Sequence, residues 1–591
     1  MRNNAMPLFR KQRFRIIAQD PAVHVKGRIL TAQVEVPVEE LAPGPRGHRV
    51  HVLDYDASQQ ILYRPLDYRR TKDGLLEDPF ANADDGTLLK DPRFHAQNVY
   101  AVVMRILARF EFALGRRVSW GFDGHQLKVA PHAFADANAF YSEHDEALMF
   151  GYFPDSRGQP VFSCLSHDVV AHETTHALVD GLRERYTDPS SPDQAGFHEG
   201  FSDVVALLSV FATPEVVRMI IDLKWQQKNK TGRHQGDPGD SRISIKSLDA
   251  DVLRDSIVLG LADQMGEEMS KIRGQPLRAS ARLKPSPKLY QESEEFKEPH
   301  RRGEILVAAM MNAFLEVWSA RLQALDPMRT GWLDRDRVVE EGAYVADRLL
   351  TMSIRALDYC PPVHIEYGDF LSALVTADYE LHPDDALKFR RSLYASFHAY
   401  GIEPASKGSA SEPGLWQPPG TEPPNRALNY SRTHFESMLR DREEVFRFIW
   451  ENRQALRLYE GAYTRVQSVR PCLRIAEDGF ALRETVADYV QILQLTAKEI
   501  AAMGIAVPEG LPPEPEEIFL YGGGVLLFDE YGRVKFHIHN RIDNTDRQAR
   551  RLRALVEFGY FSKGASAQRR FSQMHLLRAL NTPTSRQKGW I

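Results

Sequence analysis

Residues 165–182, LSHDVVAHETTHALVDGL, contain the pattern that decides how this chain folds and works. Within this stretch His172, Glu173 and His176 form the motif His-Glu-Thr-Thr-His, with apolar residues on both sides. On a helix, residues four apart lie on one face, so the two imidazoles can reach one metal ion. Glu173 lies slightly round the helix, where it can hold a water molecule rather than the metal. The alternative is a buried helix with two core histidines.

A catalytic zinc ion takes three protein ligands and keeps one position open, so a third ligand is needed. Val179 and Leu182 stand where a pattern with a third histidine would need glycine and histidine. The other solution is a carboxylate on a following helix, and the stretch GFHEGFSDVVALL supplies Glu199. Asp203 follows one turn later, where it can accept the second ring N–H of a ligand histidine. The two pairs together predict one zinc site.

These motifs resemble those of the thermolysin-like metallopeptidases, the gluzincin group. The stretch Asn138-Ala139-Phe140-Tyr141 is similar to the family's segment on a substrate-binding edge strand. The resemblance implies that Asn138 and the carbonyl of Ala139 pair with the main chain of a peptide substrate, as strand addition does elsewhere. A turn-closing role is the alternative for Asn138.

The stretch EFKEPHRRGEILVAAMMNAF, residues 295–314, resembles the family segment with the histidine that stabilises the transition state. This resemblance assigns His300 as hydrogen-bond donor to the developing oxyanion. Of its acidic neighbours, Glu295 and Glu298, position favours Glu295 as the residue that orients it. The alternative is a surface histidine in a charged loop.

Two further substrate contacts follow from the resemblance. The stretch PLRAS, residues 276–280, is similar to the arginine segment beneath the S1′ pocket, which assigns Arg278 to the substrate carbonyl. Tyr186 is the candidate for the tyrosine that assists the transition-state histidine.

The chain also departs from the family pattern. His198 stands before the third ligand, where the family usually has asparagine, and we interpret it as a replacement rather than a fourth ligand. Asp168 matches a calcium-binding residue of secreted relatives. Val210, however, stands where the next helix should offer a carboxylate, and calcium prefers several oxygen ligands, so a calcium site is doubtful.

The fold expected from the resemblance is α+β. Residues 1–90 have a β-rich pattern and lead into a thermolysin-like peptidase domain at 91–403, with a β-rich lobe, a helical lobe and a cleft between them. The Pro/Gly/Ser-rich stretch 404–427 predicts a linker, and 428–591 a separate α+β domain.

The C-terminal domain has no recognisable motif. Its pattern predicts helices at 431–459 and 478–503 and a hairpin at 518–540. A regulatory partner that binds through this domain is possible.

The composition is that of an ordinary soluble globular protein, with 43% hydrophobic and 26% charged residues in a chain of 591. The formal net charge of −5 gives no basic footprint, so no nucleic-acid partner is expected. Cys164, Cys360 and Cys472 lie far apart, which argues against both a disulfide scaffold and a cysteine-rich zinc site. No apolar run has signal-peptide or membrane-span length, so we expect a cytoplasmic protein without a membrane partner.

The sequence therefore predicts a zinc metallopeptidase that cleaves a peptide or protein substrate, with Glu173 as general base and with endopeptidase activity favoured. An aminopeptidase shares the ligand pattern, and Glu143 or Glu146 could then anchor the substrate amine. The third possibility is a latent or inactive peptidase-like binding module.

Overall fold

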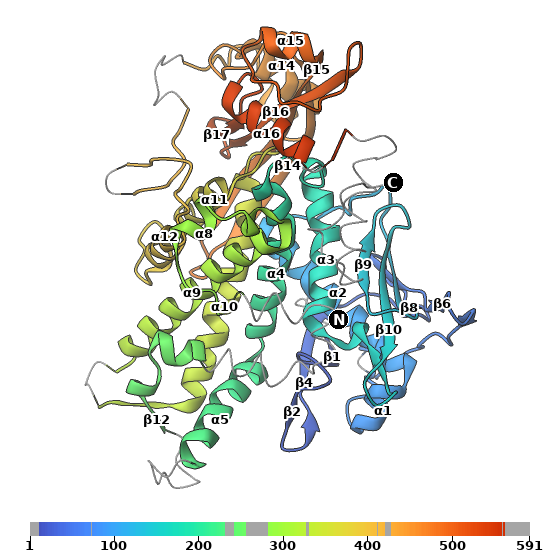
Figure 1. Ribbon diagram of the computed structural model, residues 1–591. Coiled ribbons are helices and arrows are strands. Elements are labelled where there is room, and N and C mark those ends of the chain that lie inside the picture. Colours follow the sequence, from blue (N-terminus) through green and yellow to red (C-terminus); the bar gives the residue numbers. More distant parts are fainter. Residues whose placement is uncertain are drawn as a thin grey trace, which may run out of the picture.

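The computed structural model describes residues 11–561 apart from 73, 189, 231–241, 256–279, 281, 327–329, 410–411, 420–426 and 558. The described part is mixed α+β, with a strand-rich N-terminal region, a helical central region and a C-terminal antiparallel sheet of four strands. Figure 1 shows the strand-rich region (blue to cyan) beside the central helices (green to yellow), with the C-terminal sheet (orange to red) at one end of both.

The strands of the N-terminal region are short and were expected at 24–65 and 117–153. Their bounds are β1 Lys11–Ile17, β2 His24–Val25, β3 Arg28–Ile29, β4 Thr31–Pro37, β5 Val50–Val52, β6 Tyr55–Asp56, β7 Ile61–Leu62, β8 Leu127–Phe134, β9 Ala139–Ser142, β10 Ala147–Pro154 and β11 Pro160–Phe162. The main sheet has the order β11-β10-β8-β5, with β9 paired to β10. β8 runs parallel to β5 and β10, whereas β9 and β11 run antiparallel to β10.

The helices up to the C-terminal region include the predicted helix of the His172 motif. Their bounds are α1 Asp85–Lys90, α2 Pro92–Leu114, α3 His167–Leu182, α4 Pro192–Phe211, α5 Pro214–Lys230, α8 Pro287–Gln291, α9 Pro299–Ala324, α10 Arg335–Ala356, α11 Tyr367–Tyr379 and α12 Phe389–Ala399, with the short strands β12 Arg242–Ser244 and β13 Trp332–Asp334. The helix expected at 250–272 lies largely outside the described residues.

Helix α9 is long and apolar enough, by composition alone, to cross a membrane. Its most apolar window is 83% buried against the rest of the chain, as in the core helix of a soluble fold. The sequence prediction of a packed helix at 305–318 is therefore confirmed.

Helices α4 and α9 pack at glycine positions. A Cβ atom on Gly200 would lie 2.9 Å from Cα of Gly303, and one on Gly303 would lie 3.0 Å from the backbone nitrogen of Gly200. Side chains there would force the two helices apart, because interiors are close-packed. Glu199 precedes Gly200 on α4, and His300 lies one turn before Gly303 on α9. The close approach of the two glycines therefore brings Glu199 near His300.

The C-terminal region consists of a long-stranded sheet with short helices. Its elements are α13 Phe435–Met438, α14 Arg442–Glu451, β14 Tyr463–Ile475, β15 Ala481–Thr496, α15 Ala497–Ala502, β16 Glu517–Phe528, β17 Val534–Asn540 and α16 Thr545–Glu557. The strands are antiparallel and follow chain order. The hairpin predicted at 518–540 is confirmed.

The prediction of a helix at 478–503 is wrong for most of its length. Strand β15 occupies 481–496, and only the last six residues before Met503 are helical. Residues 484–491 are buried without interruption between β14 and β16. A continuous buried run has no period of two, so its apolar residues can also fit a helical spacing.

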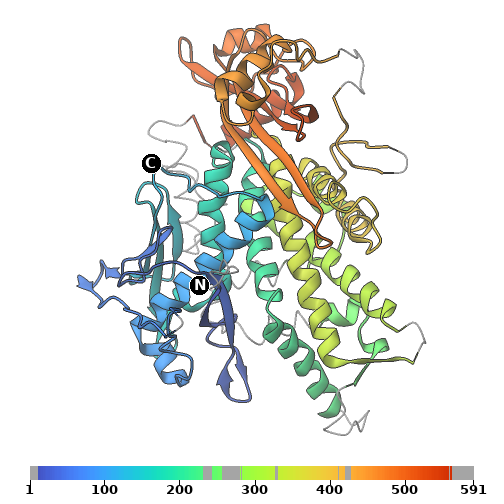
Figure 2. The ribbon, with the colours of Figure 1, turned by 180° about the vertical axis from the view of Figure 1, so that it is seen from behind.

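Buried ion pairs connect the C-terminal sheet to the central helices. Figure 2 shows the β14–β15 hairpin extending along those helices. Arg474 of β14 is fully buried, and its guanidinium lies 2.5 Å from the Asp358 carboxylate, which also accepts from Arg116 at 2.6 and 2.7 Å. Burial alone would raise the pKa of Asp358, but the two guanidinium groups bring it below its usual value. Loss of one partner in such a network typically costs about 3–5 kcal/mol.

Candidate metal centre

Two histidines of α3 and a glutamate of α4 converge at the centre of the molecule. Nε2 of His172 lies 3.7 Å from one carboxylate oxygen of Glu199, and Nε2 of His176 lies 3.7 Å from the other. The ligand atoms of all three lie within 4.8 Å of one another, and all three residues are buried. Two imidazoles and a carboxylate are a donor set that zinc accepts with one coordination position left for water or substrate. The three residues therefore fit a metal ion.

The outer nitrogen of each histidine contacts a residue of α4. Nδ1 of His172 lies 2.6 Å from the Asp203 carboxylate, which can only accept, so Nε2 presents its lone pair toward Glu199. Nδ1 of His176 lies 2.7 Å from Nδ1 of His198, and the two rings are stacked. His198 thus contacts the nitrogen of His176 that faces away from Glu199, which is the place of an orienting residue rather than of a ligand.

Glu173 connects the metal-ligand helix to the edge of the sheet. The side chain is fully buried, and one carboxylate oxygen accepts the backbone N–H of Tyr141 at 3.1 Å. Tyr141 lies on β9, which among the described strands pairs only with β10 and is therefore an edge strand. The predicted substrate residues Asn138 and Ala139 stand at the start of this strand. The Asn138 side-chain oxygen accepts the backbone N–H of Ala139 at 2.8 Å, which is a local contact of the turn-closing kind.

His300 lies beside the Glu199 carboxylate, with Nε2 at 3.8 Å from its nearer oxygen. Glu298 is the N-cap of α9: one of its oxygens accepts the Arg301 N–H at 2.8 Å, and the other lies 2.6 Å from Nδ1 of His300. Burial would raise the pKa of Glu298, but the hydrogen bond and charge of His300 and the helix N–H groups lower it overall. The carboxylate thus fixes the histidine at the first turn of the helix.

The prediction that Glu295 orients His300 is corrected by these contacts. Glu295 lies 2.8 Å from the Arg301 guanidinium instead. The N-cap position explains the difference, because the side chain of an N-cap residue turns back over the first helical turn. Glu298 occupies this N-cap position, and it is three residues closer to His300 in the sequence than Glu295 is.

Neither of the other predicted substrate residues is placed at the centre. Tyr186 is 2% exposed, its ring packs edge-on against Phe197, and its hydroxyl donates to the Pro361 carbonyl at 2.7 Å. Its role beside His300 is therefore not supported, because the hydroxyl is already used in the core. Arg278 lies outside the described residues.

A second group of potential metal ligands was missed by the sequence reasoning. It consists of His95, His132 and Cys164, all buried, with ligand atoms within 4.8 Å of one another. No short spacing links these residues, since 37 and 32 positions separate them, so no motif could reveal the group. The chain thus has two buried groups that could each hold a metal ion.

The sequence matches no protein-family model and no curated protein. What the protein does must therefore be argued from its side-chain chemistry.

Proposed function

We propose that the protein is a zinc-dependent peptidase of thermolysin-like fold that cleaves internal peptide bonds. The observation that supports this most is that His172, His176 and His300 all lie within 3.8 Å of the Glu199 carboxylate, with the buried carboxylate of Glu173 on the same helix as the first two. A purely structural zinc site would need neither an adjacent base nor a nearby donor.

The first chemical role belongs to Glu173. Zinc, when bound, supplies Lewis-acid chemistry that makes water acidic and polarises a carbonyl group. Glu173 accepts the proton of the attacking water and passes it to the departing amine. The hydrogen bond from Tyr141 N–H holds its carboxylate between α3 and the edge strand, where water and the scissile bond would have to meet.

The second role belongs to His300. With Glu298 accepting the hydrogen on Nδ1, a protonated His300 directs its Nε2–H toward the region of Glu199. A donor aimed at the place where negative charge develops stabilises the transition state more than the ground state. This contact to the reacting carbonyl oxygen would make His300 a catalytic residue.

Substrate binding follows from β9. An extended peptide can add to the strand edge that β10 leaves open, with the Ala139 carbonyl as one acceptor. Such pairing continues on both sides of the cleaved bond, which favours an endopeptidase. An aminopeptidase would need an acidic anchor for the substrate amine, but Glu146 already pairs with Lys128 at 3.1 Å.

The proposal extends to the setting of the enzyme. We infer a cytoplasmic location and a peptide or protein substrate, with no nucleic-acid or membrane partner. The C-terminal residues 428–591 are inferred to regulate access or to bind a partner. Three buried cysteines, none in a disulfide, agree with a reducing compartment.

The test compares the wild type with Glu173→Gln for zinc content and for cleavage of denatured casein or a quenched peptide library. We expect zinc in both proteins and a loss of cleavage of roughly 10²–10⁴-fold in the variant, the usual contribution of a general base. Glu340→Gln is a matched control, because that carboxylate is exposed and, within the described part of the chain, pairs with Arg337 on the same helix.

Zinc bound by both proteins with cleavage by neither would contradict the enzyme assignment and would favour a binding module. Equal cleavage by both would contradict the role of Glu173.

A further inference from the structure

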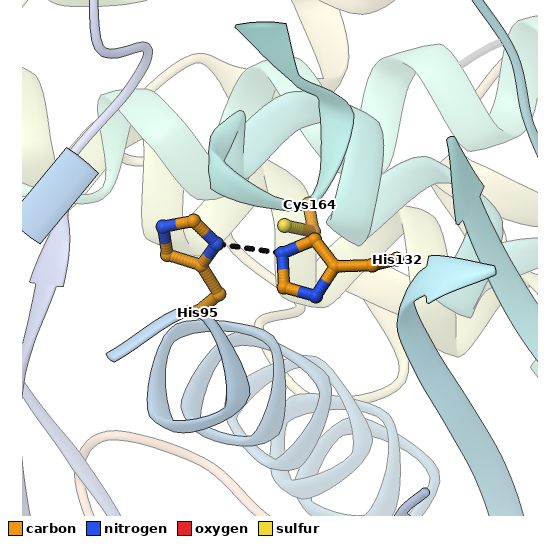
Figure 3. Close-up of side chains that lie close together, drawn as sticks. All are labelled: His95, His132 and Cys164. Atoms are coloured by element: carbon orange, nitrogen blue, oxygen red, sulfur yellow. Dashed lines mark hydrogen bonds between the residues drawn. The ribbon is translucent and has the colours of Figure 1, made fainter. Parts of the chain in front are cut away.

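A second ligand group lies in the strand-rich region, away from the catalytic residues in the fold. His95 comes from the first turns of α2, His132 from β8, and Cys164 from the 3-10 turn Ser163–Leu165 that leads into α3. Figure 3 shows the two imidazoles edge to edge, with the sulfur beside them. Nδ1 of His95 lies 2.8 Å from Nε2 of His132, and the three residues are at most 1% exposed.

The outer nitrogens of the two histidines both face acceptors. Nε2 of His95 lies 3.1 Å from the Leu89 carbonyl oxygen, and Nδ1 of His132 lies 2.8 Å from the Asp54 carboxylate. Each outer nitrogen must therefore carry the hydrogen of its neutral ring. The two inner nitrogens then face each other with lone pairs only. The row has three contacts, from the Leu89 carbonyl to His95, from His95 to His132, and from His132 to Asp54. Each needs one hydrogen, and two neutral imidazoles supply only two.

With the Asp54 carboxylate ionised, a cation between the inner nitrogens satisfies both lone pairs, and this cation is either a third proton or a metal ion. A proton there would leave an imidazolium cation fully buried, and burial disfavours the charged form of the ring. A metal ion accepts both lone pairs, and the outer acceptors are those that usually hold a ligand histidine: a backbone carbonyl and a carboxylate.

The position of the Cys164 sulfur also favours a metal ion between the two histidines. Cys360 and Cys472 each donate the S–H group to a backbone carbonyl, at 3.2 and 3.3 Å. Within the described residues, the thiol of Cys164 donates to no carbonyl and lies instead near both inner nitrogens.

We propose that His95, His132 and Cys164 hold a thiophilic divalent transition-metal ion, with zinc as the expected occupant. Two imidazoles and a thiolate suit zinc, and copper is the other ion that this donor set favours. A thiol that coordinates a metal ion is deprotonated, and its proton is released to solvent. The charges then balance, because one divalent cation offsets the thiolate and the Asp54 carboxylate, whereas without the cation Asp54 is a buried charge beside a neutral ring.

The position of the group gives it a structural role. The three ligands belong to α2, β8 and the turn before α3, so one ion would fasten the sheet to the helix that carries the catalytic motif. A cavity of about 150 Å³ is lined by Asp54 and Tyr63 among others, and both of these residues contact His132. The ring of Phe162 packs on both histidines and that of Tyr63 on His132, and the nearby Asp54 carboxylate is already held by His132.

The experiment counts metal ions per chain in the full-length protein, by elemental mass spectrometry after purification without chelators. We expect two ions in the wild type, one in Cys164→Ala, one in His172→Ala, and two in Cys360→Ala. The last variant is the matched control, because it removes an equally buried thiol that has its own carbonyl partner. Copper in place of zinc at the Cys164-dependent site supports the site and identifies the other ion.

Cobalt substitution provides an independent readout that needs neither activity nor a stable Cys164 variant. Cobalt bound by a thiolate gives an intense charge-transfer band in the near ultraviolet, and a site of nitrogen and oxygen ligands does not. The wild type and His172→Ala should both show this band. A single ion in the wild type, removed by His172→Ala, with no charge-transfer band, would overturn the proposal and assign the cation to a proton.

The two proposals fail separately in this experiment. If the wild type lacks the ion that should depend on His172, the result counts against the peptidase centre. If it lacks the ion that should depend on Cys164, the result counts against the second site.

Discussion

The two histidine groups of this molecule are built alike and differ in what stands next to them. In each, two imidazoles face inward, and a carboxylate, Asp203 or Asp54, accepts from an outer nitrogen. The first group adds the carboxylate of Glu199 and has the partly exposed His300 beside it, with a side-chain exposure of 16%. The second adds the sulfur of Cys164, is itself buried, and packs against the ring of Phe162.

This difference shows that a pair of histidines alone does not define a metal centre's role. The neighbours decide it, because a catalytic ion needs a base, a donor and access for substrate, whereas a structural ion needs only ligands and exclusion of water. On the two proposals, the same inward-facing imidazoles would serve hydrolysis in one place and structural stability in the other.

The largest difference between the two groups is expected when one ligand of each is replaced by alanine. His172→Ala should remove the first ion and reduce cleavage of denatured casein below detection. Cys164→Ala should leave the turnover number of the folded enzyme within about twofold and lower the melting temperature, because ion binding contributes to folding. Melting curves and initial rates on the same preparations check this, and a loss of turnover equal to that of His172→Ala would contradict the division of roles.

The next effect concerns the donor beside the first group. His300→Gln should lower kcat by roughly 10²–10³-fold with little change in KM and with zinc retained, since an oxyanion donor acts in the transition state. Glu295→Gln should change kcat by less than about twofold, because that carboxylate contacts Arg301 instead. An unchanged kcat in His300→Gln would remove this residue from the mechanism.

Much of the first group could be predicted from the sequence. The i, i+4 spacing fixed the face shared by His172 and His176, and the same spacing linked Glu199 to Asp203. The helix N-cap at Glu298, however, depends on where α9 starts, and the boundary of a helix is read from sequence less reliably than its existence. The close packing at Gly200 and Gly303, which brings His300 to the site, has no short-range signal.

The second group could not be predicted in this way. Its three residues come from a helix, a strand and a turn, and only the tertiary fold brings them together. The mistaken helix at 478–503 has a related cause, because pairing with β14 and β16 overrides the local preference of that segment. In both cases the deciding contacts lie far apart along the chain.

A third effect concerns α3 alone: a carboxyl group on this helix makes the stability of the fold depend on pH. Burial, then the charge of Glu143, raises the pKa of Asp180 on α3 from 3.8 to about 7, although the hydroxyl of Tyr141 opposes this. Between these values the folded protein keeps a proton that the unfolded chain has released, so stability falls as pH rises through this window. The penalty is absent below about pH 4 and complete above about pH 7, and it amounts to at most about 4 kcal/mol.

Asp180→Asn removes this penalty while keeping an acceptor for Tyr141. Chemical denaturation should therefore show a gain in unfolding free energy that is larger at pH 8 than at pH 5. A gain that is equal at the two pH values would mean that Asp180 does not titrate in this range.

The smallest effect compares the two outer carboxylates. Asp203→Asn should weaken zinc binding at the first group by roughly 10–100-fold, the usual effect of losing a carboxylate that holds a ligand histidine. Asp54→Asn should do the same at the second group only. Competition with a chromophoric chelator measures both, and a change at the wrong site in either variant would contradict the separation of the two centres.

The most direct test of the central claim is anomalous X-ray diffraction at the zinc edge from crystals of the full-length protein. A peak within bonding distance of Nε2 of His172, Nε2 of His176 and the Glu199 carboxylate is the predicted result. Full zinc occupancy elsewhere in the molecule, with no peak between these three side chains, would contradict the account.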